Sequence, residues 1–358
     1  MTVSRQETFA GTKEVEAHLQ IDAVRLHAYL ERNVPEYLGP LSLKRFKGGQ
    51  SNPTYQLVTP TRNYVLRRKP PGVLLPSAHA VDREFRVIKA LFDAGFPVPR
   101  PFVLCEDPAI LGTIFYVMEM VEGRVLWEMG LPGMTPRERA GIYDAMVSTL
   151  AQLQQLDPTR LGLADFGKPT DYFARQIARW GKTYVSSETT SIPDMDKLNA
   201  WLPAHIPPND ETSLVHGDYR MDNMIMHPTE PRVVAVLDWE LSTLGHPLGD
   251  FTYHLLPWLV PTMGEQVSNL GGLDLAALGI PRLEQYIVRY CTLTGRSEIP
   301  HLEFYSAYTV WRVAAIYQGI IKRVVDGTAA SADAPKNTNM VAELAAIAWS
   351  YAVKAGAK

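Results

Sequence analysis

The chain has 358 residues, of which 46% are hydrophobic and 20% charged, and its formal net charge at pH 7 is -3. This length allows two hydrophobic cores, and the composition excludes a disordered or fibrous protein. Because nucleic acids and anionic membranes attract clustered Lys and Arg, we expect neither as a partner.

The N-terminal sequence and the two cysteines indicate a reducing compartment. The first residues, "MTVSRQETFAGTKEVEAH", contain no apolar segment of a secretory signal. No stretch approaches the roughly 18 uninterrupted apolar residues of a membrane span. Cys105 and Cys291 match no metal-binding spacing, so buried free thiols are favoured over a disulfide or a zinc site. We therefore expect a cytoplasmic protein.

The first third of the chain is predicted to contain a small β-rich lobe. After a helix near residues 24–32, Gly and Pro residues separate several short runs of strand-like composition. These runs cover residues 41–47, 54–58 and 64–68. The order strand, turn, strand, turn, strand predicts an antiparallel sheet.

A prominent helix follows these strands. Its apolar residues Val81, Phe85, Ile88 and Phe92 recur at helical spacing and are predicted to form one stripe that packs against the lobe. Glu84 lies on the same side of the helix.

The boundary between two lobes is predicted near residue 121. The extended run "TIFYVMEMVEG" is followed by a loop that reaches Pro136, and the chain then becomes mostly helical. We expect residues 1–120 to form an N-terminal lobe and residues 121–358 to form a larger, mainly helical C-terminal lobe.

The segment "LVHGDYRMDN", residues 214–223, is polar where a strand should enter the interior. Asp218 is followed five residues later by Asn223, and a β-rich run, "RVVAVL", then leads to Asp238. Phosphoryl transfer from a nucleotide needs one carboxylate that positions the acceptor hydroxyl, and an amide and a second carboxylate that hold Mg²⁺ on the phosphates. Asp, Asn and Gly are also common turn formers, but the full arrangement favours ATP-dependent phosphoryl transfer.

Three motifs, "HGDYRMDN", "VLDWE" and "GHPLGDFTYHLL", resemble the catalytic core of the aminoglycoside phosphotransferase and choline kinase-like family. The resemblance covers nearly the whole chain. It implies that Asp218 is the catalytic base or orients the hydroxyl, and that Asn223 and Asp238 are magnesium ligands. It also implies that His216 packs within the catalytic loop and that Asp250 braces this loop, with a helix N-cap as the other possible role of Asp250.

The same resemblance implies an α+β, two-lobed protein-kinase-like fold, with a small antiparallel β lobe that carries one helix and binds the nucleotide. In this lobe, "KGGQSNPTYQL" offers Gly48, Gly49, Ser51 and Asn52, whose small side chains allow backbone N–H groups to approach phosphate oxygens. A Gly-Gly turn can also simply connect two strands.

The strand "YVLRRKP" is expected to carry the phosphate-binding cation. Val65 and Arg67 share one side of the strand, so Arg67 falls where the family usually has Lys, with Val65 beneath the adenine. Arg is planar and can bind phosphate through two N–H groups, and Lys69 is the other possible cation. Glu84 is the expected ion-pair partner, although it could also be a surface acid.

The run "YVMEMVEG" resembles the hinge strand of the family, which implies that Glu119 and Met120 lie near the adenine. Methionine at such positions also occurs as ordinary core packing. The sequence does not distinguish ATP from GTP.

The phosphate acceptor is a small molecule of undetermined identity. Residues 251–358 contain eight acidic and nine basic residues, so this segment lacks the excess of carboxylates that a polycationic aminoglycoside would need. The helical segment "FYSAYTVWRVAAIYQGIIKR" resembles a subgroup whose kinase-like domain is fused to acyl-CoA dehydrogenases, which implies a hydroxyacyl-CoA acceptor. Trp311, Arg312 and Tyr317 are then the expected substrate contacts, unless Arg312 is solvated or supports the lobe.

Other function classes stay open at this point. An aminoglycoside or choline kinase would use the same residues, and a regulatory module could bind ATP without transferring phosphate. A protein kinase is disfavoured because the sequence contains neither "HRD" nor "DFG". The sequence gives no indication of oligomeric state.

Overall fold

The structure is a computed structural model that describes residues 11–47, 52–70, 80–260, 269–328 and 339–358. None of the helices among these residues is long and apolar enough to cross a membrane.

The chain forms two compact units. The first contains the described residues up to Glu128 together with Thr159–Leu163 and Met221–Ser242, and the second contains the remainder. The segment that follows Arg220 therefore belongs to the first unit, although it lies far from it in the sequence. The predicted division into residues 1–120 and 121–358 stays a prediction.

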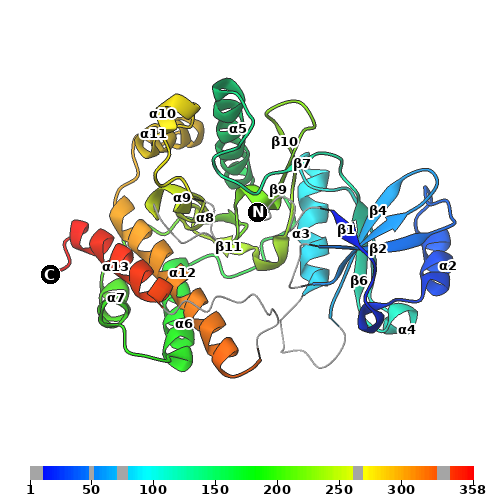
Figure 1. Ribbon diagram of the computed structural model, residues 1–358, viewed down its shortest axis with the longest axis horizontal. Helices are drawn as coiled ribbons and strands as arrows, with labels where there is room; N and C mark the ends of the chain where they lie inside the picture. Colours follow the sequence, from blue (N-terminus) through cyan, green and yellow to red (C-terminus); the bar gives the residue numbers. More distant parts are fainter. Residues whose placement is uncertain (1–10, 48–51, 71–79, 261–268, 329–338) are drawn as a thin grey trace. The chain divides into compact units, whose positions relative to one another are not determined.

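A six-stranded antiparallel sheet forms the centre of the first unit (Figure 1). Its strands, in spatial order, are β1 (Thr12–Lys13), β2 (Ser42–Phe46), β3 (Thr54–Val58), β4 (Asn63–Arg68), β6 (Phe115–Glu119) and β5 (Pro101–Cys105). The three strands predicted from the N-terminal runs are confirmed as β2, β3 and β4, and their predicted ends differ from the observed ones by no more than one residue.

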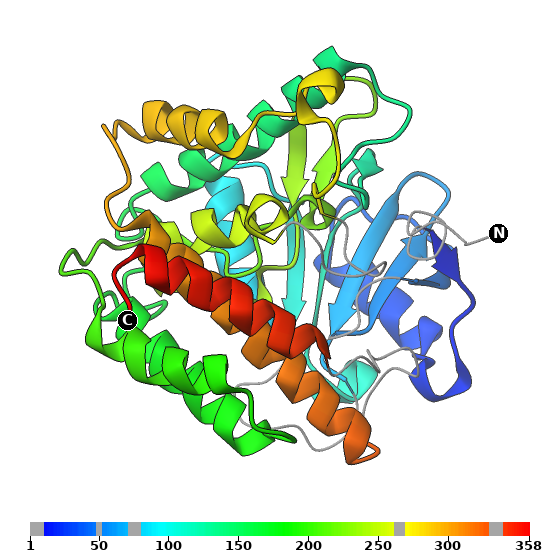
Figure 2. The ribbon, with the colours of Figure 1, turned by 60° about the vertical axis from the view of Figure 1, so that its left-hand side comes forward.

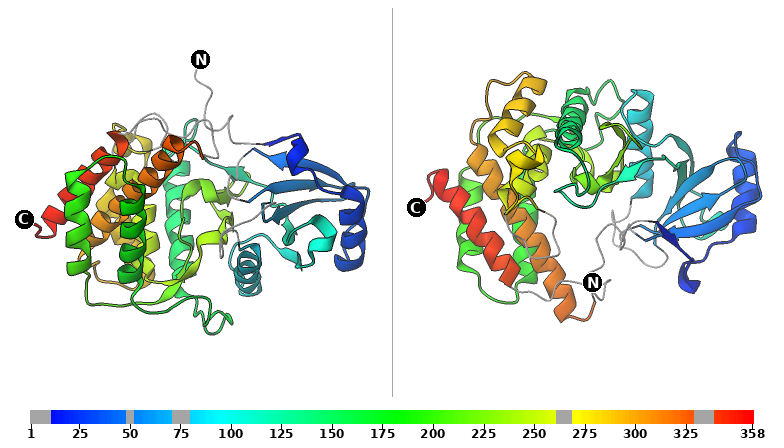
Figure 3. Two further views of the ribbon diagram at one scale, coloured as in Figure 1. Left: turned by 90° about the horizontal axis from the view of Figure 1, so that it is seen from below. Right: turned by 45° about the horizontal axis from the view of Figure 1, so that its top comes forward.

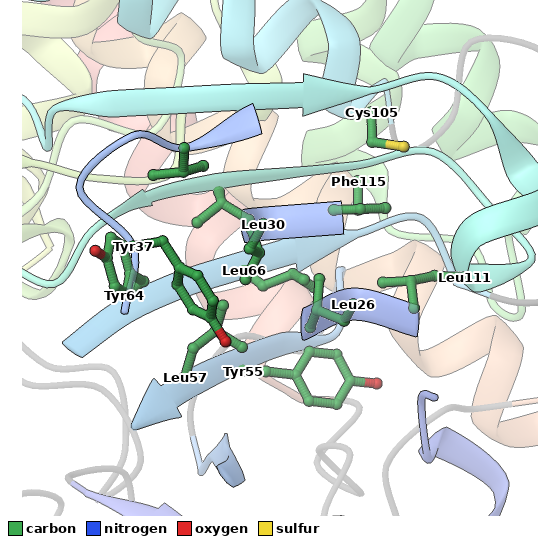
Figure 4. Close-up of a cluster of buried hydrophobic side chains, with 12 residues drawn as sticks. Leu26, Leu30, Tyr37, Tyr55, Leu57, Tyr64, Leu66, Cys105, Leu111 and Phe115 are labelled. Carbon is green, nitrogen blue, oxygen red and sulfur yellow. The ribbon is translucent and has the colours of Figure 1, made fainter. Parts of the chain in front are cut away.

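One face of this sheet packs against a helix that the sequence predicts. The helix is α2 (Ala23–Asn33), which begins where the Asp22 carboxylate accepts hydrogen bonds from two backbone N–H groups. Leu26 and Leu30 of this helix belong to one buried cluster with Leu66 of the sheet (Figure 4). The short elements η1 (Ala17–Leu19) and α4 (Pro108–Leu111) lie in the same unit.

Helix α3 (Val81–Asp93) lies on the other side of the sheet (Figure 1). Its buried side chains include Glu84, Ile88 and Leu91, whereas Phe92 is 40% exposed. The predicted apolar stripe is therefore wrong at Phe92. Spacings of three or four residues are both compatible with one helical face, and packing selects the face that brings Glu84 inside.

The first unit also contains a three-stranded antiparallel sheet. Its strands, in spatial order, are β10 (Val233–Val236), β9 (Met224–Met226) and β7 (Arg124–Val125). The 3₁₀ helix η2 (Met221–Asn223) precedes β9, and η3 (Trp239–Leu241) follows β10. The strand predicted before Asp238 is confirmed as β10.

The second unit is mainly helical, as predicted. Its helices are α5 (Pro136–Gln155), α6 (Tyr172–Ser187), α7 (Pro193–Ala204), α8 (Pro247–His254), α9 (Leu256–Leu259), α10 (Leu275–Leu278), α11 (Leu283–Thr294), α12 (Leu302–Val325) and α13 (Asn339–Lys354). A two-stranded antiparallel ribbon of β8 (Ser213–Val215) and β11 (Thr243–Gly245) completes it.

Local capping and long-range packing both define the helices of the second unit. Helix α5 begins with a reciprocal capping box, in which Glu138 N–H donates to Thr135 Oγ1 and Thr135 N–H donates to the Glu138 carboxylate. Helix α12 packs along α13 and α6, and α13 packs against α7 (Figures 2 and 3). Helix α12 also contacts α8, which places it against the segment that supports Asp218.

Both cysteines, Cys105 and Cys291, are buried and free, which confirms that they form no disulfide.

Candidate active site

The polar segment after β8 is held by one buried carboxylate. Asp250, in the first turns of α8, accepts hydrogen bonds from the backbone N–H groups of His216 (2.5 Å) and Gly217 (2.8 Å). Gly217 adopts a φ of 87°, which favours glycine. Asp250 is 1% exposed, and burial raises the pKa of its carboxyl, while the two N–H donors lower it. The N-cap of α8 is His246, so Asp250 is available to the loop.

His216 shapes the same loop from inside. Its ring is fully buried, and Nδ1 accepts a hydrogen bond from the Asp218 backbone N–H at 3.2 Å. The ring also meets that of Tyr219 edge to face. These contacts fix the backbone on both sides of Gly217.

The Asp218 carboxylate is held through both of its oxygens. The Tyr253 hydroxyl donates to Oδ1 at 2.7 Å, and Arg220 Nε lies 3.3 Å from Oδ2. The Asp218 side chain is 18% exposed and that of Arg220 is 49% exposed. Since each carboxylate oxygen can accept more than one hydrogen bond, Asp218 can still accept one from a substrate hydroxyl.

The three substrate residues predicted on α12 have different surroundings. Arg312 is 6% exposed, and its Nη2 donates to the Gly217 carbonyl at 3.0 Å. Trp311 is fully buried and donates its indole N–H to Asn199 Oδ1. Tyr317 is half-buried. The structure thus brings Arg312 to the Asp218 loop, and the substrate roles of all three residues stay predictions.

In the first unit, Arg67 is surrounded by acidic side chains. Its Nη1 lies 2.8 Å from Glu84 Oε1, and its Nη2 lies 2.9 Å from Asp238 Oδ1 and 3.6 Å from Glu240 Oε2. Burial raises the pKa of the Glu84 carboxyl, and the positive charge of Arg67 acts against this shift. The Glu84 side chain is fully buried, so Glu84 is no surface acid. Lys69 instead lies 3.5 Å from Asp82 at the start of α3.

The two predicted magnesium ligands lie at one end of the β9–β10 pair. Asn223 directly precedes β9, and its carbonyl accepts the Leu237 backbone N–H at 2.8 Å, next to Asp238. Asp238 follows with a φ of 68° and has a partly exposed side chain. An amide oxygen and a carboxylate are hard ligands of the kind that Mg²⁺ takes from proteins, together with phosphate oxygens and water. The residues present therefore fit this ion.

Of the four loop residues predicted to contact the phosphates, the structure describes only Asn52. Gly48, Gly49 and Ser51 are outside the described residues. Asn52 is fully buried and donates from Nδ2 to Glu240 Oε2 at 3.0 Å.

The predicted hinge residues are both half-buried. Glu119 ends β6, and its backbone N–H donates to the Arg100 carbonyl. Met120 Sδ lies 3.2 Å from Gln56 Nε2. Their contact with adenine stays a prediction.

Sequence reasoning missed three polar residues of these clusters: Tyr253, Arg220 and Glu240. Each lies within a motif that was singled out for another residue. Tyr253 is three residues after Asp250, a spacing that places both on one face of a helix, so the helical reading of "GDFTYH" contained a signal for it.

A family model described as "Phosphotransferase enzyme family" matches residues 42–285. Acyl-CoA dehydrogenase family member 10 of Mus musculus is 44% identical over 347 residues, which cover 97% of this chain and 32% of that protein. The chain spans less than half the length of the curated relatives that it matches.

Two solved structures agree with the fold. A Ralstonia eutropha protein, provisionally described as an aminoglycoside phosphotransferase, is 50% identical with a TM-score of 0.85, and the match covers 94% of this chain and 99% of that one. A thermostable mutant of aminoglycoside phosphotransferase APH(4)-Ia, in complex with ADP and hygromycin B, is 16% identical with a TM-score of 0.58, over 94% of this chain and 100% of that one. The predicted α+β, protein-kinase-like fold is confirmed.

Replacing the carboxylate that holds the loop tests its importance. We expect Asp250→Asn to lower the free energy of unfolding by about 2–3 kcal/mol, because two buried N–H groups lose a charged acceptor. Urea denaturation measures this change. Asp274→Asn is the matched control, since Asp274 also accepts a backbone N–H but is exposed; equal losses in both variants would contradict the expectation.

A buried histidine predicts a pH dependence of stability. His254 is 3% exposed, its Nε2 lies 2.7 Å from the Tyr286 hydroxyl, and burial lowers its pKa to about 4. Unfolded His has a pKa of about 6.5, so the unfolded state takes up the proton first. The contribution of neutral His254 to the free energy of unfolding is therefore complete above pH 6.5 and is lost as the pH falls towards 4.

We expect the lost contribution to amount to about 2–4 kcal/mol. The measurement is urea unfolding between pH 4 and 7 for the native chain and for His254→Gln. The variant should show a flatter dependence over this window, and identical slopes would contradict the expectation.

Proposed function

Because this chain belongs to the phosphotransferase enzyme family, we propose that it transfers the terminal phosphoryl group of ATP to a hydroxyl group of a hydroxyacyl-CoA. Membership confirms the resemblance that three motifs indicated, and it makes the chain a phosphotransferase with an alcohol group as acceptor. The observation that carries the proposal is the Asp218 carboxylate, held through both oxygens on a loop that Asp250 braces.

The nucleotide is assigned to the first unit. Arg67 is the phosphate-binding cation, because Glu84 and Asp238 fix the direction of its guanidinium. Asn223 and Asp238 would hold Mg²⁺, which when bound neutralises charge on the phosphates. The Asn52 side chain donates a hydrogen bond to Glu240, which lies beside the Arg67 guanidinium.

Asp218 serves the acceptor. The acceptor hydroxyl donates a hydrogen bond to the Asp218 carboxylate, and its oxygen attacks the terminal phosphorus. The bond from this phosphorus to the bridging oxygen breaks, ADP leaves, and the hydroxyl proton passes to Asp218. Positioning and charge stabilisation contribute most of the catalysis in such reactions, which suits a carboxylate that is already immobilised.

A hydroxyacyl-CoA is favoured over the other acceptors. The chain is 44% identical to acyl-CoA dehydrogenase family member 10, a protein whose name refers to an acyl-CoA substrate. Residues 251–358 lack the acidic excess that a polycation would require. The description of the Ralstonia eutropha structure keeps an aminoglycoside as the second candidate.

The proposal is tested by coupled ADP release with Mg²⁺ and ATP. We expect turnover with 3- or 4-hydroxyacyl-CoAs and none with choline or kanamycin. Asp218→Asn should lower kcat by about 10²- to 10⁴-fold, as for loss of a general base. Turnover with kanamycin alone would transfer the proposal to the second candidate. ATP binding without turnover on any acceptor would favour a regulatory module.

The role of Arg67 is tested by nucleotide affinity. Arg67→Lys keeps the charge but loses the planar group that contacts two carboxylates, so we expect AMP-PNP to bind about 10-fold more weakly, or about 1.4 kcal/mol. Isothermal titration calorimetry gives this constant. Arg62→Lys, at an exposed ion pair with Glu36 in the same unit, is the control, and an unchanged affinity for Arg67→Lys would reassign the cation.

A further inference from the structure

Helix α8 contacts the catalytic loop at two points. Asp250 binds the backbone N–H groups of His216 and Gly217, and one turn later the Tyr253 hydroxyl donates to Asp218 Oδ1 at 2.7 Å. The first contact holds the backbone of the loop, and the second holds the carboxylate itself.

Tyr253 can act only as the donor in this contact. Burial raises the pKa of its phenol, and the negative charge of Asp218 raises it further. The phenol therefore keeps its proton at all physiological pH values, and Asp218 Oδ1 is the acceptor. Oδ2, beside the half-exposed Arg220, is then the oxygen that we assign to the substrate hydroxyl.

Arg312 contacts both the Tyr253 ring and the backbone of the catalytic loop. Its guanidinium lies over the ring of Tyr253, 5.2 Å from the centroid, and 5.6 Å from the ring centroid of Trp180. The same group donates to the Gly217 carbonyl at 3.0 Å. One guanidinium thus contacts the Tyr253 ring and also donates a hydrogen bond to the loop, so the positions of the Tyr253 ring and of the loop are linked.

We propose that Tyr253 and Arg312 are positioning residues that orient the Asp218 carboxylate, with Arg312 setting the Tyr253 ring and the Gly217 carbonyl. This inference rests on the proposed function of Asp218. It differs from the substrate contact that the sequence predicted for Arg312. A substrate contact acts on the KM of the acceptor, whereas a positioning residue acts on kcat.

The first test compares Tyr253→Phe with Tyr143→Phe. Each substitution keeps the aromatic ring and removes only the hydroxyl. Tyr143 is a fully buried tyrosine of the same unit, whereas Tyr253 is half-buried, and the Tyr143 hydroxyl donates to a backbone carbonyl at 2.7 Å. We expect Tyr253→Phe to lower kcat by roughly 10- to 100-fold, as for a misplaced catalytic group, with the acceptor KM and the ATP affinity unchanged. Tyr143→Phe should keep the kcat of the native chain.

Arg312→Lys is the second variant and keeps the positive charge without the planar group. We expect Arg312→Lys to lower kcat and to leave the acceptor KM unchanged. The double variant, Arg312→Lys with Tyr253→Phe, should have a kcat only slightly below that of the slower single variant, because both changes act through one carboxylate. A raised acceptor KM at constant kcat, or an unchanged kcat in both single variants, would overturn the proposal.

A readout without turnover separates this inference from the proposed function. Crystal structures of the native chain and of Tyr253→Phe show whether the Asp218 carboxylate rotates when the hydroxyl is removed. A rotated carboxylate supports positioning even if no acceptor is phosphorylated, in which case only the proposed function fails. If the Asp218 carboxylate keeps its orientation in Tyr253→Phe and kcat is also unchanged, the positioning role is overturned. The same orientation in a chain that shows no turnover overturns it as well.

Discussion

The hydrogen bonds that Asp250 accepts from the backbone N–H groups of His216 and Gly217 are the constraint on which the second unit's chemistry depends. A fully buried carboxylate is costly unless charged or polar groups satisfy it, and here two backbone N–H groups do so. In the conformation that meets this demand, Gly217 is left-handed. That conformation is what presents Asp218 to its neighbours and the Gly217 carbonyl to Arg312.

A related constraint organises the first unit, where one guanidinium contacts several carboxylates. Arg67 uses separate nitrogens for Glu84 and Asp238, which a lysine ammonium cannot do with the same geometry. This difference gives a physical reason why arginine can occupy a position where the family usually has lysine. It also couples α3 to the end of β10, because the buried Arg67 guanidinium is paired with one carboxylate from each.

The arrangement around Arg312 changes where acceptor recognition has to be sought. An arginine on α12 suggested an anion-binding substrate contact, but its buried guanidinium lies over the rings of Trp180 and Tyr253 and donates a hydrogen bond to the catalytic loop. If Arg312 serves the loop, specificity for the acceptor depends on more exposed groups near Asp218, of which Arg220 is the first to consider. The same helical lobe then supplies both the orientation of the catalytic group and the substrate contacts.

The sequence by itself determined the local features of this protein. Helical and strand periodicity located α2, β2, β3, β4 and α12, and the motifs "HGDYRMDN" and "LDWE" contain Asn223 and Asp238, which the first unit brings to one end of the β9–β10 pair. Only the tertiary structure decided the buried face of α3, the donor to Asp218 and the partner of Arg312. The contacts of Tyr253 with Asp218 and of Arg312 with Gly217 join residues 35 and 95 positions apart, and local periodicity contains no information about which distant side chains packing brings into contact.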